Sequence, residues 1–484
     1  MTDVRETRRR LRWSRRGFVQ GGLAAVAMGV AGETGAVAEG ALTPEMFGAR
    51  GDGRTNDSLA FGLLAGRINA MGGGTIVLRK AVYVVGRQVP SLRPGGPSFE
   101  AAPLLHFRNC AQPIVIEGNG AVLRCEAGLR FGTFDAATGA PLRRPLPYTG
   151  GGWATPYEHM ISVVECGSVR ISDLELDGNL RQLHLGGPYG DTGYQISGSG
   201  IYLRNNRGDE ILRNIHTHHH PQDGVMIDGL DDAALARRVT RRLENVRCEY
   251  NARQGCSIVG GRGIVFSGCR FNRTGKGGLA SDPGAGVDIE AEGGKRNVDF
   301  TFTDCEFVDN TGCGMVADSG PSEGATFTRC TFIGTTSWSA WPGKPRFSFR
   351  SCTFIGALCH AAEVADPRLA TTFIDCVFLD DPAKSPTGKV YLLAGNSGAI
   401  ADLNENGTPI FVRSRFTLTH NAQLPWSEKA TYRDCTMSQA SPKQAFPRGR
   451  FEGRNVIRGN VGLGASKVVG ELILNGQVVP PNAT

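Results

Sequence analysis

The chain repeats a short pattern in which apolar residues alternate with polar ones, shift by one position at a two-residue bend, and alternate again. Phe302-Thr-Asp-Cys-Glu-Phe307 and Phe327-Thr-Arg-Cys-Thr-Phe332 are two examples, and their central cysteines lie 25 residues apart. Alternation with a period of two predicts a strand, and the bend predicts a corner. A repeat of this length predicts a solenoid in which each repeat forms one coil. The same slot is read at Cys248, Cys269, Cys305, Cys330, Cys352, Cys376 and Cys435, with Ser414 filling one gap.

A second repeat does not depend on the cysteines. Five segments read glycine, apolar, any residue, apolar, any residue, and they begin at Gly200, Gly224, Gly255, Gly286 and Gly314. We expect each glycine to mark the entry from a loop into a strand, where unusual backbone angles favour it. Parallel strands stacked about 4.8 Å apart would align the outward side chains into columns. The first predicted column is Tyr202, Met226, Ser257, Asp288 and Val316, and the second is Arg204, Asp228, Val259, Glu290 and Asp318.

Composition changes this picture in one respect. Glycine makes up 67 of the 484 residues, roughly twice the usual share. Because corners and loop exits of a repetitive body use glycine, the length need not mean several domains. Helices are scarce, and the clearest candidate follows Asn56-Asp57, a possible cap.

A motif near the N-terminus carries a resemblance to a known group. The segment 47–57 (Phe-Gly-Ala-Arg-Gly-Asp-Gly-Arg-Thr-Asn-Asp), the predicted helix, and the strands 72–78 and 81–85 resemble the start of pectate-lyase-like proteins. The resemblance spans roughly residues 43–440. It implies an all-β fold, a single right-handed parallel β-helix of roughly ten coils, with an N-terminal capping helix and long loops. We therefore expect an export segment at 1–38, the β-helix at 39–440, and a C-terminal tail or cap at 441–484.

The first residues resemble a twin-arginine export signal. Ser14-Arg15-Arg16-Gly17-Phe18 precedes the apolar stretch 21–31, and Ala36-Val37-Ala38 offers small residues for cleavage after Ala38. The stretch is too short to span a bilayer, although a membrane-anchored helix is the alternative. We expect a periplasmic or secreted protein with no integral membrane segment in its mature chain. The net charge is +7, of which the first 38 residues carry +4, so the remaining +3 argues against a nucleic-acid partner.

An exported chain with 13 cysteines would ordinarily form disulfides. Here the cysteines recur in matching apolar settings, which favours small buried core residues with free thiols. No metal-ligand spacing is visible among them. Three consecutive histidines, residues 218–220, cannot all converge on one metal from an extended strand, so no metal site is predicted.

The aligned columns bring carboxylates together. Asp288 and Glu290 would share a face at about 6.6 Å, and Glu290 and Asp318 would lie on adjacent coils. Clustered carboxylates repel, which separates their pKa values and makes an acid and a base from one residue type. We predict catalytic roles for Asp288, Glu290 and Asp318, assisted by Asp228 or Asp223. The alternatives are solvated surface carboxylates or a Ca²⁺ site.

Polar residues near the same strand entries are the predicted substrate contacts: Arg204, Arg253, His220, Tyr202 and Gln254. Asp223 and Arg253 are expected at the rim of the carboxylate face. Three insertions, 128–160, 181–198 and 335–346, carry aromatic residues such as Tyr148, Tyr189, Tyr194, Trp338 and Trp341. Such rings suit the apolar face of a sugar, or they pin their own loops.

The polygalacturonase motifs do not carry over to this chain. Only Asp223 matches, because Arg253-Gln254 stands where an aspartate pair belongs and Ala285 stands where a histidine belongs. The leading hypothesis is a glycoside hydrolase acting on an oligo- or polysaccharide without a cofactor, and the Asp288–Glu290 spacing favours inversion. A lyase or uronate epimerase, with His220 or Arg253 as base and Ca²⁺ possible, is the alternative. A third is a non-catalytic polysaccharide-binding protein.

Overall fold

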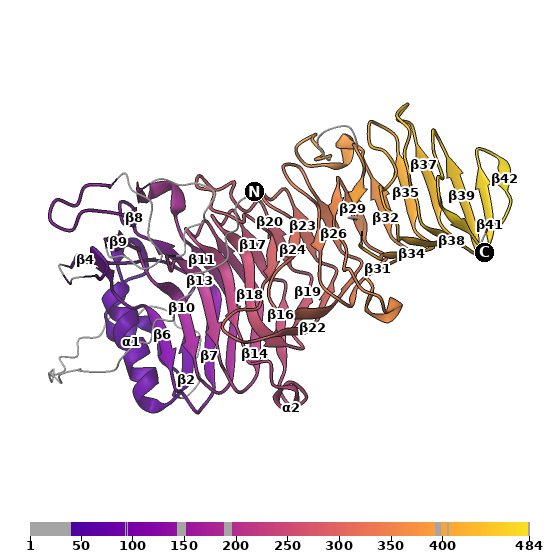
Figure 1. Cartoon of the computed structure of the whole chain (residues 1–484). Helices are drawn as coiled ribbons and strands as arrows, with labels where there is room; N and C mark the ends of the chain where they lie inside the picture. The colour runs from indigo at the N-terminus through magenta and orange to yellow at the C-terminus, as the bar shows by residue number, and fades with distance from the viewer. Residues whose placement is uncertain are drawn as a thin grey trace. The chain divides into compact units, whose positions relative to one another are not determined.

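The computed structural model describes residues 40–91, 93, 95–142, 152–187, 196–392, 398–403 and 406–482. The predicted export segment lies outside these residues, and so do Tyr148, Tyr189 and Tyr194 of the insertions. The contacts within residues 40–484 form one compact unit. This unit is a parallel β-helix, in which successive turns of the chain add strands to the same stacks (Figure 1).

Each coil contributes strands to as many as three stacks. Stack 1 consists of β6 (Leu105–Arg108), β10 (His159–Val164), β13 (Ser199–Arg204), β15 (Asp223–Asp228), β18 (Gln254–Arg262), β21 (Val287–Ile289), β24 (Met315–Ala317) and β27 (Trp341–Pro342). Stack 2 consists of β2 (Gly74–Val77), β7 (Ile114–Cys125), β11 (Val169–Asp177), β14 (Glu210–His218), β16 (Arg241–Glu244), β19 (Val265–Ser267), β22 (Asn297–Thr303), β25 (Ser322–Thr328), β28 (Phe347–Arg350), β31 (Thr372–Ile374), β34 (Ile410–Val412), β36 (Thr431–Arg433), β38 (Arg450–Glu452) and β40 (Lys467–Val468).

Stack 3 begins with β3 (Val82–Val85) and the second halves of the long strands β7, β11 and β14. It continues through β17 (Arg247–Glu249), β20 (Arg270–Asn272), β23 (Glu306–Val308), β26 (Thr331–Ile333), β29 (Thr353–Ile355), β32 (Val377–Leu379), β35 (Arg415–Leu418), β37 (Thr436–Gln439), β39 (Arg454–Arg458) and β41 (Glu471–Leu474). The stacking therefore does not stop at residue 440, since β38 to β41 add further coils to stacks 2 and 3.

Several shorter strands and helical segments remain besides the strands of the three stacks. Strand β1 (Asp52–Asn56) pairs with β3, and β42 (Gln477–Val479) pairs antiparallel with β41. Two smaller sheets are formed by β4 (Gln88–Pro90), β5 (Phe99–Ala101), β8 (Arg130–Thr133), β9 (Trp153–Ala154) and β12 (His184–Gly186), and by β30 (Leu358–Cys359) and β33 (Ala401–Asp402). The short helical segments are η1 (Pro44–Phe47), η2 (Leu180–Gln182), α2 (Ala233–Ala236), η3 (Pro367–Leu369) and η4 (Pro382–Lys384).

The predicted capping helix is confirmed as α1 (Ser58–Met71), which packs against β6. Phe61, Leu64 and Ile68 are buried, whereas Leu59 and Leu63 are exposed. Asp57 occupies the N-cap position, but its carboxylate accepts hydrogen bonds from the backbone of Arg50 and Gly51 instead of from the helix. The motif around residues 47–57 is thus tied together by this one side chain.

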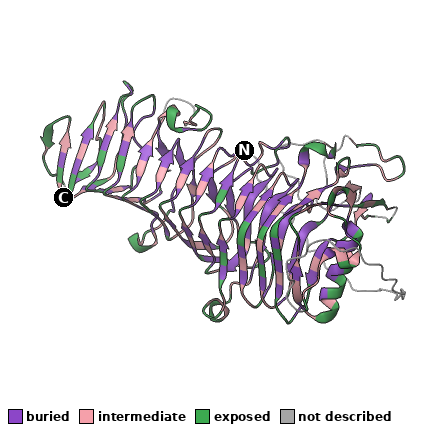
Figure 2. Cartoon of the chain, turned by 180° about the vertical axis from the view of Figure 1, so that it is seen from behind, coloured by how far each residue is buried: buried purple, intermediate pink, exposed green. Residues whose placement is uncertain are grey.

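The core confirms the alternating pattern, which Figure 2 shows as buried and exposed positions along the strands. Phenylalanine rings form two ladders through the interior, and Phe266, Phe302 and Phe327 stack at 4.3 and 4.6 Å between ring centroids. All 13 cysteines are buried and free, as predicted. The corner residues before the cysteine slot, such as Asp304 and Asp375, take left-handed backbone conformations that Asn and Asp tolerate.

The structure corrects one member of the cysteine ladder. Cys248 pairs with Phe271, and the backbone of Val246 accepts the hydrogen bond that the slot residue should accept. Val246 therefore fills the slot in that coil, two residues before the predicted position. Ser414 does fill the slot, since its carbonyl accepts a hydrogen bond from Thr436 in the way that Cys435 accepts one from Val456.

The five glycines that begin the repeats serve a different purpose from the one expected. None has a left-handed backbone conformation. Instead, a Cβ atom on Gly224 would lie 2.7 Å from the carbonyl oxygen of Gly255, and one on Gly286 would lie 2.5 Å from that of Gly314. Close approach of successive coils, and not backbone freedom, requires glycine here.

Candidate active site

The first predicted column is confirmed residue by residue. Tyr202 pairs with Met226, Met226 with Ser257, Ser257 with Asp288, and Asp288 with Val316. The next coil adds Trp341, which pairs with Val316. The column therefore places a carboxylate in the middle and a large aromatic ring two coils further on.

The second predicted column holds only in part. Arg204 pairs with Asp228 as expected, but the register shifts in β18, so Asp228 pairs with Gly260 and not with Val259. This irregularity separates Arg204 and Asp228 from the later members of the column, Glu290 and Asp318. Arg204 therefore does not frame the carboxylates.

Asp288 is the buried member of the carboxylate group. Its residue is 8% exposed, and its Oδ2 atom accepts a 2.8 Å hydrogen bond from the side-chain amide of Gln254. Burial, and then the negative charge of Glu290, raise the pKa of Asp288 well above the usual range for a carboxyl group. A carboxyl whose pKa is raised is better suited to act as a general acid than one with its ordinary pKa.

Glu290 and Asp318 lie next to Asp288 in the directions that the repeats predicted. Glu290 is half-buried and accepts a 2.5 Å hydrogen bond from the Ser319 hydroxyl, and Asp318 is exposed. The negative charges of both residues raise the pKa of Asp288, whereas the positive charge of Arg253 lowers it. This part of the predicted site is brought together by the fold.

Asp223 and Arg253 are placed differently from the expectation. They are not free at a rim, because Arg253 donates two hydrogen bonds to Asp223, of 2.9 and 2.6 Å, and both side chains are buried. The Ser257 hydroxyl also donates to Asp223 at 2.9 Å. This pair joins two coils beneath the column, so both residues are positioned to support the site and not to receive a substrate.

Asp228 belongs to a second polar group. Arg204 lies 3.2 Å from its carboxylate, the Tyr202 hydroxyl donates to it at 3.2 Å, and the ammonium group of Lys295 contacts the other oxygen. Burial and the charge of Asp228 raise the pKa of Tyr202 to about 12. Sequence reasoning missed Lys295, which lies in a loop 67 residues from Asp228 and carries no local motif.

The structure does not bring His220 to this face. Its side chain is fully buried, and its Nδ1 atom lies 2.8 Å from the hydroxyl of Tyr157, which is also fully buried. Burial lowers the pKa of His220 well below its ordinary value. The sequence predicted a loop end at residues 218–223, just before the strand that begins at Gly224, but the corner at His219 turns His220 inward.

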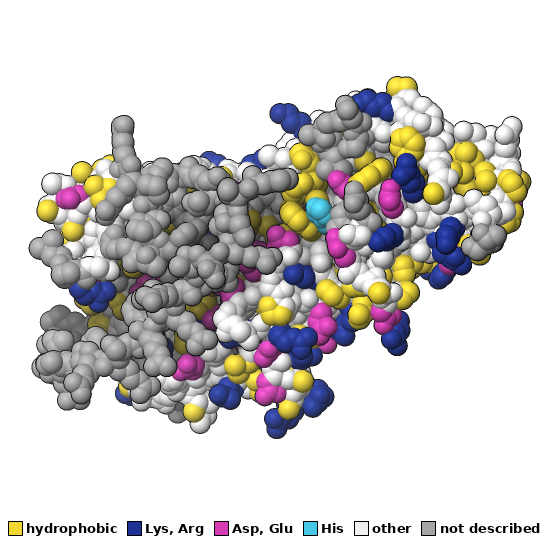
Figure 3. All heavy atoms as spheres, viewed as in Figure 1, with side chains coloured by type: hydrophobic (Ala, Val, Ile, Leu, Met, Phe, Trp, Pro, Cys, Tyr) yellow, Lys and Arg dark blue, Asp and Glu magenta, His cyan; other side chains and the backbone are white. Residues whose placement is uncertain are grey.

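A hollow of about 290 Å³ adjoins the carboxylates and was not predicted as such. Asp318, Trp341, His360 and Glu363 contribute to its wall. The Trp341 ring stacks on His360 at 4.8 Å between centroids, and Trp338 packs against Trp341 at 5.2 Å. Asp318 thus belongs both to the carboxylate group and to the wall of an aromatic hollow. Figure 3 shows acidic side chains among apolar ones in the middle part of one face.

Among the described residues, no helix is long and apolar enough to cross a membrane.

Comparison with known proteins agrees with the fold. The family model for the right-handed β-helix region matches residues 160–354, so the hand expected from the N-terminal motif is confirmed there. No curated protein sequence matches the chain.

Similar solved structures include the A-module of mannuronan C-5 epimerase AlgE4 from Azotobacter vinelandii, at 15% identity and a TM-score of 0.43, over 91% of this chain and 99% of that one. An exopolygalacturonase from Thermotoga maritima has 12% identity and a TM-score of 0.35, over 92% of this chain and 94% of that one. A tailspike protein from Acinetobacter baumannii bacteriophage Fri1, a capsular polysaccharide depolymerase, has 12% identity and a TM-score of 0.40, over 93% of this chain and 65% of that one.

Proposed function

We propose that this right-handed β-helix protein is a glycoside hydrolase that acts on an oligo- or polysaccharide. Asp288 is assigned as general acid, and Glu290 or Asp318 as the base that activates water. The observation that carries the proposal is the raised pKa of Asp288 inside a group of three carboxylates. Glycoside hydrolysis uses two carboxyl groups, and the pKa of the one that acts as acid is raised.

The surroundings of the carboxylates support a sugar as the substrate. A pyranose ring presents an apolar face that packs on an aromatic ring, and Trp341 lies in the same outward column as Asp288. Its hydroxyl groups would find hydrogen-bond partners in Asp318, His360 and Glu363 around the hollow. Lys295 and Arg204, both held at Asp228, add positive charge two coils away and favour a substrate with acidic sugars.

In the catalytic step, Asp288 would donate its proton to the glycosidic oxygen while Glu290 or Asp318 takes a proton from the attacking water. Gln254 holds the Oδ2 atom of Asp288, which leaves Oδ1 to carry the proton. Ser319 donates to Glu290 and fixes its orientation. Because the acid must be protonated, activity should fall as the pH rises through the raised pKa of Asp288.

The lyase or epimerase alternative needs a base that removes a proton beside a uronate carboxylate. The two residues that the sequence offered for this role are His220, which is buried in the core, and Arg253, which is paired with Asp223. Their placement favours hydrolysis over proton abstraction by either group. A non-catalytic polysaccharide-binding protein, the third alternative, would not require the raised pKa of Asp288.

A screen over acidic and neutral polysaccharides separates the three functions. Each reaction is followed both for new reducing ends and for the ultraviolet absorbance of unsaturated uronates. Hydrolysis predicts reducing ends without absorbance, a lyase gives both, and an epimerase changes the uronate composition at constant chain length. Binding without any chemical change would overturn the proposal of an enzyme.

A further inference from the structure

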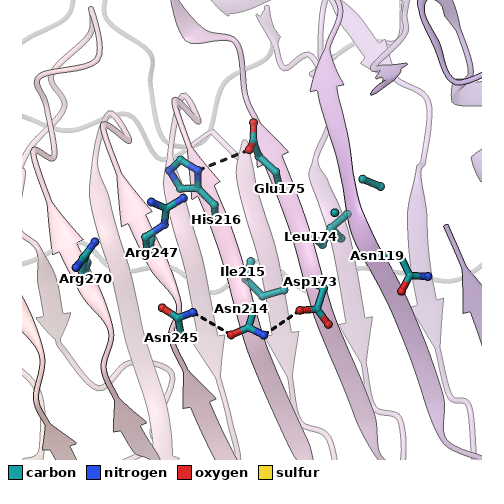
Figure 4. A pocket seen from close by; sticks show the side chains of 12 residues that line it. Asn119, Asp173, Leu174, Glu175, Asn214, Ile215, His216, Asn245, Arg247 and Arg270 are labelled. Carbon is teal, nitrogen blue, oxygen red and sulfur yellow. Dashed lines mark hydrogen bonds and ion pairs between the residues drawn. The ribbon is translucent and has the colours of Figure 1, made fainter. Parts of the chain in front are cut away.

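A second cluster of polar side chains lies on the outer surface of stack 3, where β7, β11, β14, β17 and β20 border a hollow of about 670 Å³ (Figure 4). One edge of the hollow follows the corner residues. Asn214 donates a 2.8 Å hydrogen bond to Asp173, and Asn245 donates a 2.9 Å bond to Asn214. The opposite edge carries Glu175, His216 and Arg247 (Figure 4).

The strand register builds this edge as a grid of outward side chains. Glu175 pairs with His216, and His216 pairs with Arg247. Two residues further along the same strands, Asp177 pairs with His218, and His218 pairs with Glu249. The intervening Thr217 is buried, so both histidines point outward from one strand.

The two histidine side chains of the grid converge on Glu175, His216 from the paired position and His218 from the diagonal one. His218 Nε2 lies 3.4 Å from Oε1 of Glu175, and His216 Nδ1 lies 3.9 Å from Oε2 of the same carboxylate. The rings of His216 and His218 lie 4.2 Å apart between centroids. One ligand atom from each of Glu175, His216 and His218 therefore falls within 4.8 Å of the other two.

The remaining ring nitrogens also have defined surroundings. His218 Nδ1 lies 2.8 Å from Nδ1 of His219 and 3.7 Å from Oδ1 of Asp177, and Arg124 holds Asp177 at 3.1 Å. Such a carboxylate behind a histidine fixes the ring orientation in metal sites. His216 Nε2 is buried and accepts or donates no hydrogen bond among the described residues, although Oε2 of Glu249 is 3.3 Å away.

From this geometry we propose a binding site for a divalent transition-metal ion, with Glu175, His216 and His218 as its ligands. Two imidazoles and one carboxylate are a donor set that suits zinc and its neighbours better than calcium or magnesium. In a tetrahedral zinc site the ligand atoms lie about 3.4 Å apart, so small side-chain rotations close the present cluster around an ion. The side of the site that faces the hollow leaves a position for water or an anionic ligand.

This site lies on a different stack from the carboxylate group of Asp288 and stands independently of the proposed hydrolase activity. The alternative interpretation is a set of ion pairs without a metal, in which protonated histidines neutralise Glu175 and Glu249. The metal site and the ion pairs predict different effects of added zinc on the protein. Only a metal site predicts that zinc binds tightly at one equivalent and that the same three side chains are required.

The test uses the untagged full chain, stripped of metal and dialysed against zinc, with the bound metal measured by elemental analysis. We expect one equivalent per chain and a zinc-dependent rise in the thermal unfolding midpoint. His216→Ala with His218→Ala should weaken zinc binding by more than about 100-fold, and Glu175→Gln, which preserves side-chain shape, should also weaken it. His184→Ala removes an exposed histidine elsewhere and serves as the matched control.

Loss of bound zinc in Glu175→Gln, with the unfolding midpoint of the metal-free protein unchanged, supports the site even where the double histidine variant fails to fold. Absence of bound zinc from the wild-type chain overturns the proposal. Equal zinc binding by the wild-type and Glu175→Gln proteins overturns it as well.

Discussion

The side-chain amide of Gln254 donates a 2.8 Å hydrogen bond to Oδ2 of Asp288, from the strand that precedes it in stack 1. Gln254 also accepts a hydrogen bond from the backbone of Ala285, so its orientation is fixed at both ends. This relationship holds a buried carboxyl group in one position beside Glu290. It explains how the fold presents one acidic proton to the outer face of a regular sheet.

Burial of Asp288 has a consequence for stability that can be measured. The pKa of this carboxyl is raised in the folded state above its ordinary value of 3.8. Its contribution to stability is therefore fully present below the unfolded pKa and is lost as the pH rises through the folded pKa. Asp288→Asn lacks this titration, so its free energy of unfolding relative to wild type should increase with pH. Urea unfolding over a pH series measures the difference, and a difference independent of pH would contradict the raised pKa.

The buried pair of Arg253 and Asp223 predicts a large loss of stability when one partner is removed. Asp223→Asn removes the carboxylate that accepts two hydrogen bonds from the buried Arg253 guanidinium, which should cost about 3–5 kcal/mol. Chemical denaturation checks this value. The matched control is Asp304→Asn, because Asp304 makes a similar two-bond contact with Arg329 at the exposed surface. Solvent screens that pair, so equal destabilisation by the two substitutions would argue against the structural role of the buried one.

Trp341 is expected to contribute to substrate binding more than to catalysis. Its ring lines the hollow beside Asp318 and stacks on the ring of His360. Trp341→Ala should raise KM about tenfold, with kcat changed little, because a lost aromatic contact is worth about 0.5–1.5 kcal/mol beyond its area. Steady-state kinetics on the best substrate of the screen would show this. Trp426→Ala, two coils beyond β30 and outside the residues that line the hollow, should leave both constants unchanged. A fall in kcat alone for Trp341→Ala would assign the ring a different role.

The cysteine ladder predicts that the thiols of the native protein are chemically inert. All 13 thiols are free and buried, so a thiol reagent should label none of them in the native protein and all of them after denaturation. Reducing agents should not shift the thermal unfolding midpoint, since no disulfide contributes to it. Fewer than 13 reactive thiols in denatured, unreduced protein would indicate disulfides and contradict the ladder.

The coils, the first outward column and the buried thiols could be predicted from the sequence because each depends on a local period. The period of two and the repeat length fix which side chains face outward, and this was enough to place Ser257, Asp288 and Val316 in one row. The predictions that were wrong failed because of irregularities at single residues. The register shift at Val259 and the inward turn at His219 have no counterpart in the periodic pattern.

Contacts between residues that are far apart in the chain could not be predicted from the sequence either. Lys295 reaches Asp228 from a loop, and Glu175 meets His216 only because two coils stack in register. Within the histidine run, His220 is buried in the core, whereas His218 Nδ1 lies 2.8 Å from Nδ1 of His219, so the three side chains do not all converge. The proposed metal site instead uses His216 and His218, which lie two residues apart on β14.

The central claim is that Asp288 acts as the acid and Glu290 or Asp318 as the base on a polysaccharide, and turnover by shape-preserving variants tests it most directly. With the substrate identified by the screen, Asp288→Asn should lower kcat by about 10²–10⁴, and so should Glu290→Gln or Asp318→Asn, whichever removes the base, while thermal unfolding shows that the variants remain folded. Asp375→Asn, at an exposed ion pair with Arg413, should keep full activity. Wild-type turnover by Glu290→Gln and Asp288→Asn would contradict the account.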